Sequence, residues 1–151
     1  MIWSARLCLA LISLGWTYAL FKGIRAIKRR KWVLDHSAPP APQDIPVSIV
    51  IPARNEERGV GRCLQSAREQ DHPSLQIVIL DDASTDDTPN IIAEHVSTDE
   101  RIVALRGDGS PLPDGWFGKP WALQRAQREA HGEWLLFIDA DVELAPEAVS
   151  R

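Results

Sequence analysis

Four short apolar runs alternate with segments of helical spacing, and this alternation limits the possible folds more than any other feature of the sequence. The apolar runs cover residues 47–53, 76–80, 101–105 and 134–138. Helical spacing of apolar side chains is found in residues 57–69, 88–96 and 119–131. Strands that alternate with helices in this way form a mostly parallel sheet with helices on both faces. The sequence therefore predicts an α/β domain built on such a sheet.

Polar side chains follow three of the predicted strands, at the point where each strand ends. They are Arg54, Asn55 and Glu56 after the first strand, Asp81 and Asp82 after the second, and Asp139 and Asp141 after the fourth. Ligands of parallel α/β sheets bind at the carboxyl ends of the strands. We therefore expect these side chains to converge on one ligand. Residues 135–138 are expected to be a buried central strand that supports the carboxylates.

Asp139 and Asp141 have a spacing that suits a metal ion. In extended chain, residues two apart point the same way, so both carboxylates can face one ligand while Ala140 points away. Two such charges repel each other unless a cation lies between them. Carboxylate oxygens suit Mg²⁺ or Mn²⁺, which keeps positions open for substrate phosphates. The alternative is a solvated strand end whose acids cap a helix.

Two further segments could bind other parts of the same ligand. One of Asp81 and Asp82 should face the cleft and accept hydrogen bonds from a nucleobase or a ribose; alternatively, both cap the helix at 88–96. Lys119 lies at a predicted helix start, where a cation and free backbone N–H groups suit a diphosphate. The neighbouring Trp116 and Trp121 belong to the same segment; alternatively, they serve only in hydrophobic packing or in contact with the membrane. Neither the P-loop pattern nor G-x-G-x-x-G is present.

The N-terminal segment has the length and flanking charges of a membrane anchor. Residues 2–21 carry a single charge, on Arg6, and about 20 such residues span a bilayer as a helix. Six basic residues follow within 22–31, so the positive-inside rule places the rest of the chain in the cytoplasm. An interfacial helix, or an apolar helix packed on the domain, is the alternative. The basic run could also bind anionic lipid headgroups.

These features divide the chain into three parts. We expect a single transmembrane anchor at 1–22, a basic juxtamembrane segment with a Pro-rich linker at 23–45, and a domain at 46–151. The linker has four prolines between residues 36 and 46 and no periodicity, which is typical of a semi-rigid spacer.

The charge distribution and the few Cys and His residues argue against several classes of function. From residue 35 onward, ten Lys and Arg stand against 21 Asp and Glu, a net charge of −11. Nucleic acid is therefore not expected as a partner, because phosphate binding needs a positive surface. Cys8 and Cys63 make no disulfide framework, and Cys63 is expected in the core. His131 is expected to cap the helix at 119–131, which Gly132 ends.

Four stretches together resemble a known family. "VSIVIPARNEE", "VILDDASTDDT", "GWFGKPWALQRA" and "GEWLLFIDADVEL" are similar, in order and spacing across residues 46–147, to the family 2 inverting glycosyltransferases, which have a GT-A fold. The Gly-Lys-x-Trp-Ala-Leu stretch and the N-terminal anchor also resemble the membrane-bound branch that includes hopanoid-associated and carotenoid-type glycosyltransferases.

The resemblance implies a nucleotide-sugar donor, and a UDP-sugar is the expected one. It also implies roles for particular residues. Pro52, Ala53, Asn55 and Glu56 match the first donor-site loop, Asp82 the acid that contacts the base, Lys119 the diphosphate region, and Asp139 and Asp141 the metal-binding Asp-x-Asp. Of the last two, Asp141 is the one expected to coordinate the metal directly. The metal would neutralise the leaving diphosphate. A lipid acceptor is expected from the membrane anchor.

One departure from the family concerns the acceptor half. The chain stops ten residues after Asp141, so the family's C-terminal half, with its general base, is missing and we expect an N-terminal fragment. A membrane-anchored module that binds a nucleotide without turnover is therefore an alternative. A haloacid-dehalogenase-like phosphatase, with Asp139 and Asp141 as nucleophile and general acid, is a further one.

Overall fold

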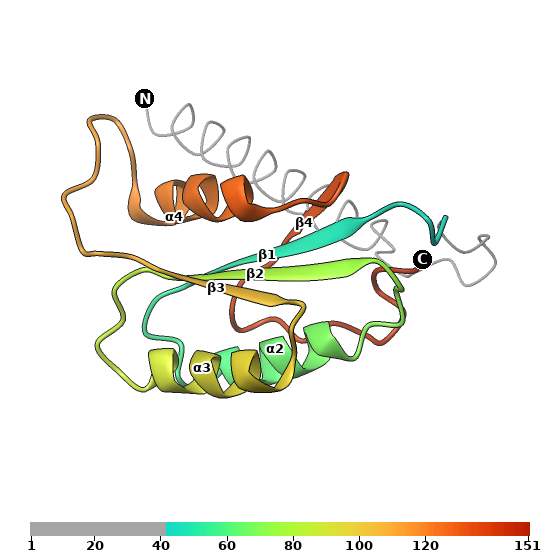
Figure 1. Cartoon of the computed structure of the whole chain (residues 1–151). Coiled ribbons are helices and arrows are strands. Elements are labelled where there is room, and N and C mark those ends of the chain that lie inside the picture. The colour runs from blue at the N-terminus through green and yellow to red at the C-terminus, as the bar shows by residue number, and fades with distance from the viewer. Residues whose placement is uncertain (1–41) are drawn as a thin grey trace, which may run out of the picture. The chain divides into compact units, whose positions relative to one another are not determined.

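The computed structural model describes residues 42–151, which form a four-stranded parallel sheet between two layers of helices (Figure 1). The element order is β1 (Val47–Ala53), α2 (Val60–Arg68), β2 (Leu75–Asp81), α3 (Thr88–Thr98), β3 (Ile102–Arg106), α4 (Gly118–Ala126), the 3₁₀ turn η1 (Gln127–Glu129) and β4 (Trp134–Phe137). The strand order is β3-β2-β1-β4, and every pairing is parallel. Helices α2 and α3 cover one face of the sheet and α4 covers the other. The predicted α/β architecture with helices on both faces is confirmed.

The two central strands are mostly apolar on both sides because both of their faces are buried. In β1, Ile49 and Ile51 pack under α2 and α3, whereas Val50 packs under α4. Strand β2 repeats the pattern, with Ile77 on the first face and Val78 on the second. Side chains that alternate between two covered faces give a continuous apolar run instead of an apolar–polar alternation. This burial holds the strand ends at a fixed position.

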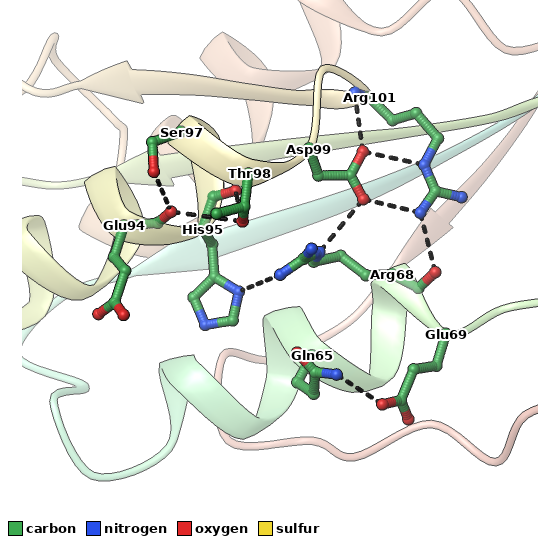
Figure 2. Close-up of polar contacts among 9 residues, drawn as sticks. All are labelled: Gln65, Arg68, Glu69, Glu94, His95, Ser97, Thr98, Asp99 and Arg101. Atoms are coloured by element: carbon green, nitrogen blue, oxygen red, sulfur yellow. Dashed lines mark hydrogen bonds and ion pairs between the residues drawn. The ribbon is translucent and has the colours of Figure 1, made fainter.

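A largely buried carboxylate after α3 joins the layer formed by α2 and α3 to the start of β3. The side chain of Asp99, which follows α3, is only 10% exposed and accepts hydrogen bonds from Arg101 (2.7 Å) and Arg68 (3.2 Å), as Figure 2 shows. Arg101 also donates to the Arg68 carbonyl oxygen. The Arg101 hydrogen bonds hold the pKa of Asp99 well below its usual range. The network joins α2 to the turn between α3 and β3.

Strand β4 lies at an edge of the sheet, so the expectation of a buried central strand is wrong. It pairs with β1 alone, and no element among residues 42–151 pairs with its outer edge. Trp134 is 65% exposed, and Leu135 and Phe137 are also exposed. Leu136 and Ile138 are the side chains of this run that pack against the core. An apolar run predicts a strand but does not predict how many neighbours the strand has.

The segment between α4 and β4 also differs from the prediction. The α-helix ends at Ala126, and the chain is extended by Ala130. His131 therefore does not cap the helix; its backbone N–H donates to the Gln76 side chain on β2. Gly132 donates its N–H to the hydroxyl of Ser48 (2.8 Å) and lies against β1. These attachments to the sheet draw the chain out of the helix before Gly132.

The predicted anchor at 1–22 and most of the segment at 23–45 lie outside the described residues and stay predictions. Residues 43–45 form a turn that leads into β1. Between residues 42 and 151, no helix has the length and apolar character needed to cross a membrane.

Candidate functional site

A cavity of about 240 Å³ lies where the carboxyl ends of β1, β2 and β4 meet the start of α4. Its lining residues are Pro52, Ala53, Arg54, Glu56, Asp82, Gly118, Lys119, Ala122, Asp139, Ala140 and Asp141. All the residues that the sequence assigns to the donor and metal sites are therefore brought together, with the exception of Asn55. Arg54 belongs to the predicted polar cluster, but its side chain had no assigned role.

Asn55 holds two loops together instead of lining the cavity. It has a positive φ of 55°, and its side-chain oxygen accepts a hydrogen bond from the Thr85 N–H at 2.8 Å. Its own N–H donates to the Ser84 hydroxyl at 2.9 Å, and the next N–H, of Glu56, donates to Thr88 at 2.8 Å. The loops after β1 and β2 are therefore locked to each other. The Glu56 side chain remains at the cavity.

The two adjacent acids at the end of β2 face different surroundings, as the alternation of side chains predicts. Asp81 is buried and accepts a hydrogen bond from the Ser84 N–H at 3.0 Å, which shapes the loop. Asp82 faces the cavity, where Arg54 lies 3.6 Å from its carboxylate. Neither acid caps α3, since the Thr88 N–H at the helix start bonds Asp86 instead. Asp82 is therefore the acid that a ligand in the cavity can reach.

Asp139 and Asp141 both line the cavity, and small residues around them allow close packing. Ala140 between them is buried. The start of α2 presses against this turn: a Cβ on Gly59 would lie 3.0 Å from the Asp141 Cα. No helix N–H within residues 42–151 donates to either carboxylate, so the helix-capping alternative has no support there. Lys119, at the start of α4, forms an ion pair with Asp139 at 2.6 Å.

The chemistry of this donor set fits a hard divalent cation that a substrate helps to bind. No group of three or more His, Cys, Asp or Glu residues in the described part of the chain could hold a metal ion alone. Mg²⁺ and similar ions are often held by one or two carboxylates, with the remaining positions filled by waters and substrate phosphates. Two carboxylates beside an open cavity provide that arrangement. The Asp139 carboxylate is accessible in the cavity, since it is 57% exposed and the Lys119 ammonium lies 2.6 Å from one of its oxygens.

Cys63 lies beneath the two carboxylates and is a core residue, as predicted. Its side chain is buried, and its sulfur lies 3.5 Å from the Asp139 carbonyl oxygen. Burial, together with the charges of Asp141 and Asp139, raises the pKa of Cys63 to about 12. A thiol in this state is neither a nucleophile nor a metal ligand at neutral pH.

An exposed apolar loop leads into the cavity. Leu112, Trp116 and Phe117 are exposed large apolar residues in the segment before α4, and Phe117 is 77% exposed. Trp116 and Trp121 pack edge to face with ring centroids 5.1 Å apart, so the packing alternative holds between these two. The loop ends at Gly118 and Lys119, which line the cavity.

The chain is similar in sequence to known glycosyltransferases. The profile of the family described as "Glycosyl transferase family 2" matches residues 48–151. The chain is 28% identical over 145 residues to the 4,4'-diaponeurosporenoate glycosyltransferase of Staphylococcus aureus strain USA300, across 94% of this chain and 34% of that protein. It therefore spans about a third of the length of this relative.

Solved structures with a similar fold include the following three. The mannosyltransferase PcManGT from Pyrobaculum calidifontis, in complex with GDP-Man and Mn²⁺, has a TM-score of 0.63 and 28% identity, over 88% of this chain and 38% of that one. S. aureus TarS with UDP-GlcNAc has a TM-score of 0.54 and 29% identity, over 64% and 27%. Glucosyl-3-phosphoglycerate synthase from Mycobacterium tuberculosis, with Mn²⁺, UDP and glucosyl-3-phosphoglycerate, has a TM-score of 0.52 and 25% identity, over 68% and 36%.

The fold, the cavity at the strand ends and these similarities agree with one another. The sheet with its two helical layers is GT-A-like, and the phosphatase alternative finds no match among these relatives. The family profile covers more than half of the chain. The chain therefore belongs to glycosyl transferase family 2.

Proposed function

We propose that residues 46–151 form the donor-binding part of an enzyme that transfers a sugar from a nucleotide-sugar, with Mg²⁺ or Mn²⁺ bound at Asp139 and Asp141. The observation that carries the proposal is the convergence of Asp82, Lys119, Asp139 and Asp141 on one cavity from three separate parts of the chain. Similar structures support it, since PcManGT is in complex with GDP-Man and Mn²⁺ and TarS is in complex with UDP-GlcNAc.

Each cavity residue has a distinct task in this proposal. Asp82 accepts hydrogen bonds from the base, and Lys119 with the start of α4 binds the diphosphate. Helix α4 has no side-chain cap, so its first N–H groups have no capping partner and can bind a phosphate oxygen. Asp139 and Asp141 hold the metal, which when bound neutralises charge on the leaving diphosphate. We take UDP as the nucleotide for the tests below.

Substitution of Asp82 tests the base contact. We expect Asp82→Ala to weaken binding of uridine and of UDP alike, by about ten- to a hundredfold, because a charged hydrogen-bond acceptor is lost. Isothermal titration of the full chain measures both affinities, and Asp71→Ala, which removes an exposed acid outside the cavity, is the matched control. A variant that loses UDP affinity but keeps uridine affinity would contradict the assignment.

Turnover separates the enzyme from a module that only binds. Metal-dependent hydrolysis or transfer from a radiolabelled UDP-sugar, abolished by EDTA, is the result expected of a transferase. Metal-dependent nucleotide binding without either reaction would instead favour the binding module.

A lipid acceptor at the cytoplasmic face of the membrane is the further part of the proposal. It is supported by the predicted anchor at 1–22 and by the exposed Leu112, Trp116 and Phe117 in the loop that ends at the cavity residues Gly118 and Lys119. We expect Phe117→Ser to reduce transfer to a lipid acceptor while leaving UDP affinity unchanged. Full activity on soluble acceptors after deletion of residues 1–35 would count against the lipid acceptor.

A further inference from the structure

The cavity already holds a cation at one of the two carboxylates proposed to bind the metal. The Lys119 ammonium lies 2.6 Å from a carboxylate oxygen of Asp139. The two residues come from different elements, since Lys119 is the second residue of α4 and Asp139 follows β4. Among residues 42–151, no Lys, Arg or His lies within ion-pair distance of Asp141. The neutralisation is therefore confined to Asp139.

Lys119 and a divalent cation cannot share Asp139 at low cost. Both would contact the same carboxylate, and a lysine charge held a few ångströms from a doubly charged ion repels it. A metal that binds alone must therefore displace the lysine, or bind Asp141 and the second oxygen of Asp139 against the repulsion of the lysine. The lysine opposes metal binding as long as no other anion attracts it.

The diphosphate of a nucleotide is the anion that could attract Lys119 away from Asp139. It carries more negative charge than one carboxylate, and it would bind at the same helix start where Lys119 lies. The lysine side chain is 56% exposed and has a flexible four-carbon stem. It can therefore move within the cavity without disturbing the core.

We propose that Lys119 is a built-in counter-ion of Asp139 that transfers to the donor diphosphate when the nucleotide binds, which frees Asp139 for the metal. This rests on the proposed donor site. Metal and nucleotide binding are then coupled through one side chain, and the coupling is reciprocal. Metal alone binds weakly. The nucleotide increases the affinity for metal by more than its phosphate ligands alone would, because it also removes the lysine from Asp139.

The test is a set of Mn²⁺ and UDP titrations on the full chain, with free Mn²⁺ followed by electron paramagnetic resonance. In the absence of nucleotide, Lys119→Met should bind Mn²⁺ about three- to tenfold more tightly than the wild type, because the competing charge is gone. The same variant should bind UDP with Mn²⁺ about three- to tenfold more weakly, because a diphosphate contact is lost. A purely structural role for Lys119 would weaken both.

Two control variants test whether the effect depends on a positive charge at residue 119 and not on a positive charge elsewhere on α4. Lys119→Arg keeps the cation and should bind Mn²⁺ alone as weakly as the wild type does. Arg125→Met removes a positive charge from the same helix at a residue outside the cavity, and it should leave Mn²⁺ affinity unchanged. Circular dichroism checks that each variant is folded.

Two results would overturn the proposal. The first contradicts only the counter-ion role of Lys119, and the second also contradicts the metal site. If Lys119→Met binds Mn²⁺ alone no better than the wild type, or neither binds detectably, while UDP still promotes Mn²⁺ binding, the counter-ion role is wrong and the donor site stands. If the wild type binds no Mn²⁺ even with UDP present, the metal assignment fails and this proposal fails with it.

Discussion

Replacing Gly132 by alanine should displace the strand that carries the two cavity carboxylates. A Cβ at this position would lie 2.4 Å from the Ser48 backbone nitrogen and 2.7 Å from the Val47 carbonyl carbon. No side-chain rotation relieves a contact with backbone, so the start of β4 must move away from β1. That movement also breaks the hydrogen bond from the Gly132 N–H to the fully buried Ser48 hydroxyl.

The cost of this change can be estimated from two terms. Overpacking costs about 1–3 kcal/mol, and a buried hydroxyl that loses a hydrogen bond costs about 1–3 kcal/mol. The two terms together predict that Gly132→Ala lowers the free energy of unfolding by about 2–6 kcal/mol, measured by urea denaturation with linear extrapolation.

Gly61→Ala is the matched control, because a Cβ there meets its nearest atom, on the Ile91 side chain, at an ordinary 3.4 Å. Gly61 is inside α2, where alanine is favoured by about 0.5–1 kcal/mol, so this variant should be slightly more stable than the wild type. If Gly132→Ala unfolds at the wild-type urea midpoint, the close approach between Gly132 and β1 is incorrect.

Three further predictions follow from packing and charge. Gly59→Ala should weaken Mn²⁺-dependent UDP binding about three- to tenfold with little loss of stability, since its Cβ would press on Asp141; unchanged affinity would argue against that contact. Asp99→Asn should lower stability by about 1–3 kcal/mol at pH 7. Hydrogen bonds from Arg101 lower the pKa of Asp99 in the folded state. The contribution of Asp99 to the free energy of unfolding is therefore present above about pH 4 and is lost as the pH falls below that. The urea midpoint should therefore vary less between pH 2 and 7 in Asp99→Asn than in the wild type. If the midpoint depends on pH in the same way in both proteins, the network around Asp99 is contradicted. With the other cysteine replaced by serine, Cys63 should resist thiol reagents at pH 8 until urea unfolds the chain, and rapid labelling of the folded chain would show that its burial is wrong.

Local patterns were sufficient for the central strands and for the location of the cavity. Residues 47–53 and 76–80 are mostly apolar on both faces, and their bounds coincide closely with those of β1 and β2. Alternation of side chains correctly predicted that one of Asp81 and Asp82 faces the cavity; the choice of Asp82 came from the resemblance, and the structure has Asp82 at the cavity and Asp81 buried. Parallel strands present their carboxyl ends at one edge, and that rule was enough to bring Asp82 and Asp139 together.

Long-range contacts account for what the sequence did not reveal. Whether Trp134 and Phe137 are buried depends on the neighbours of β4, and those neighbours are set by strand order. Gly132 was predicted to end a helix, yet its position against Ser48 depends on a contact between residues 84 positions apart. The ion pair between Lys119 and Asp139 likewise joins two elements that only the fold brings together.

The loop residue Asn55 illustrates a different limit. Its position in the first polar cluster indicated a ligand contact, whereas its side-chain oxygen accepts a hydrogen bond from the Thr85 backbone. An amide can bind either a ligand or a neighbouring loop with the same atoms. The choice is made by a positive φ that no sequence pattern around this residue predicted.

The most direct test of the donor site compares UDP affinity with and without Mn²⁺ in the full-length wild type and in Asp141→Ala. The account predicts that Mn²⁺ strengthens UDP binding by the wild type, and that the variant binds UDP equally with and without the ion. A variant that keeps the full effect of Mn²⁺ would contradict the account, because the cavity at the strand ends would not be where the metal and the nucleotide meet.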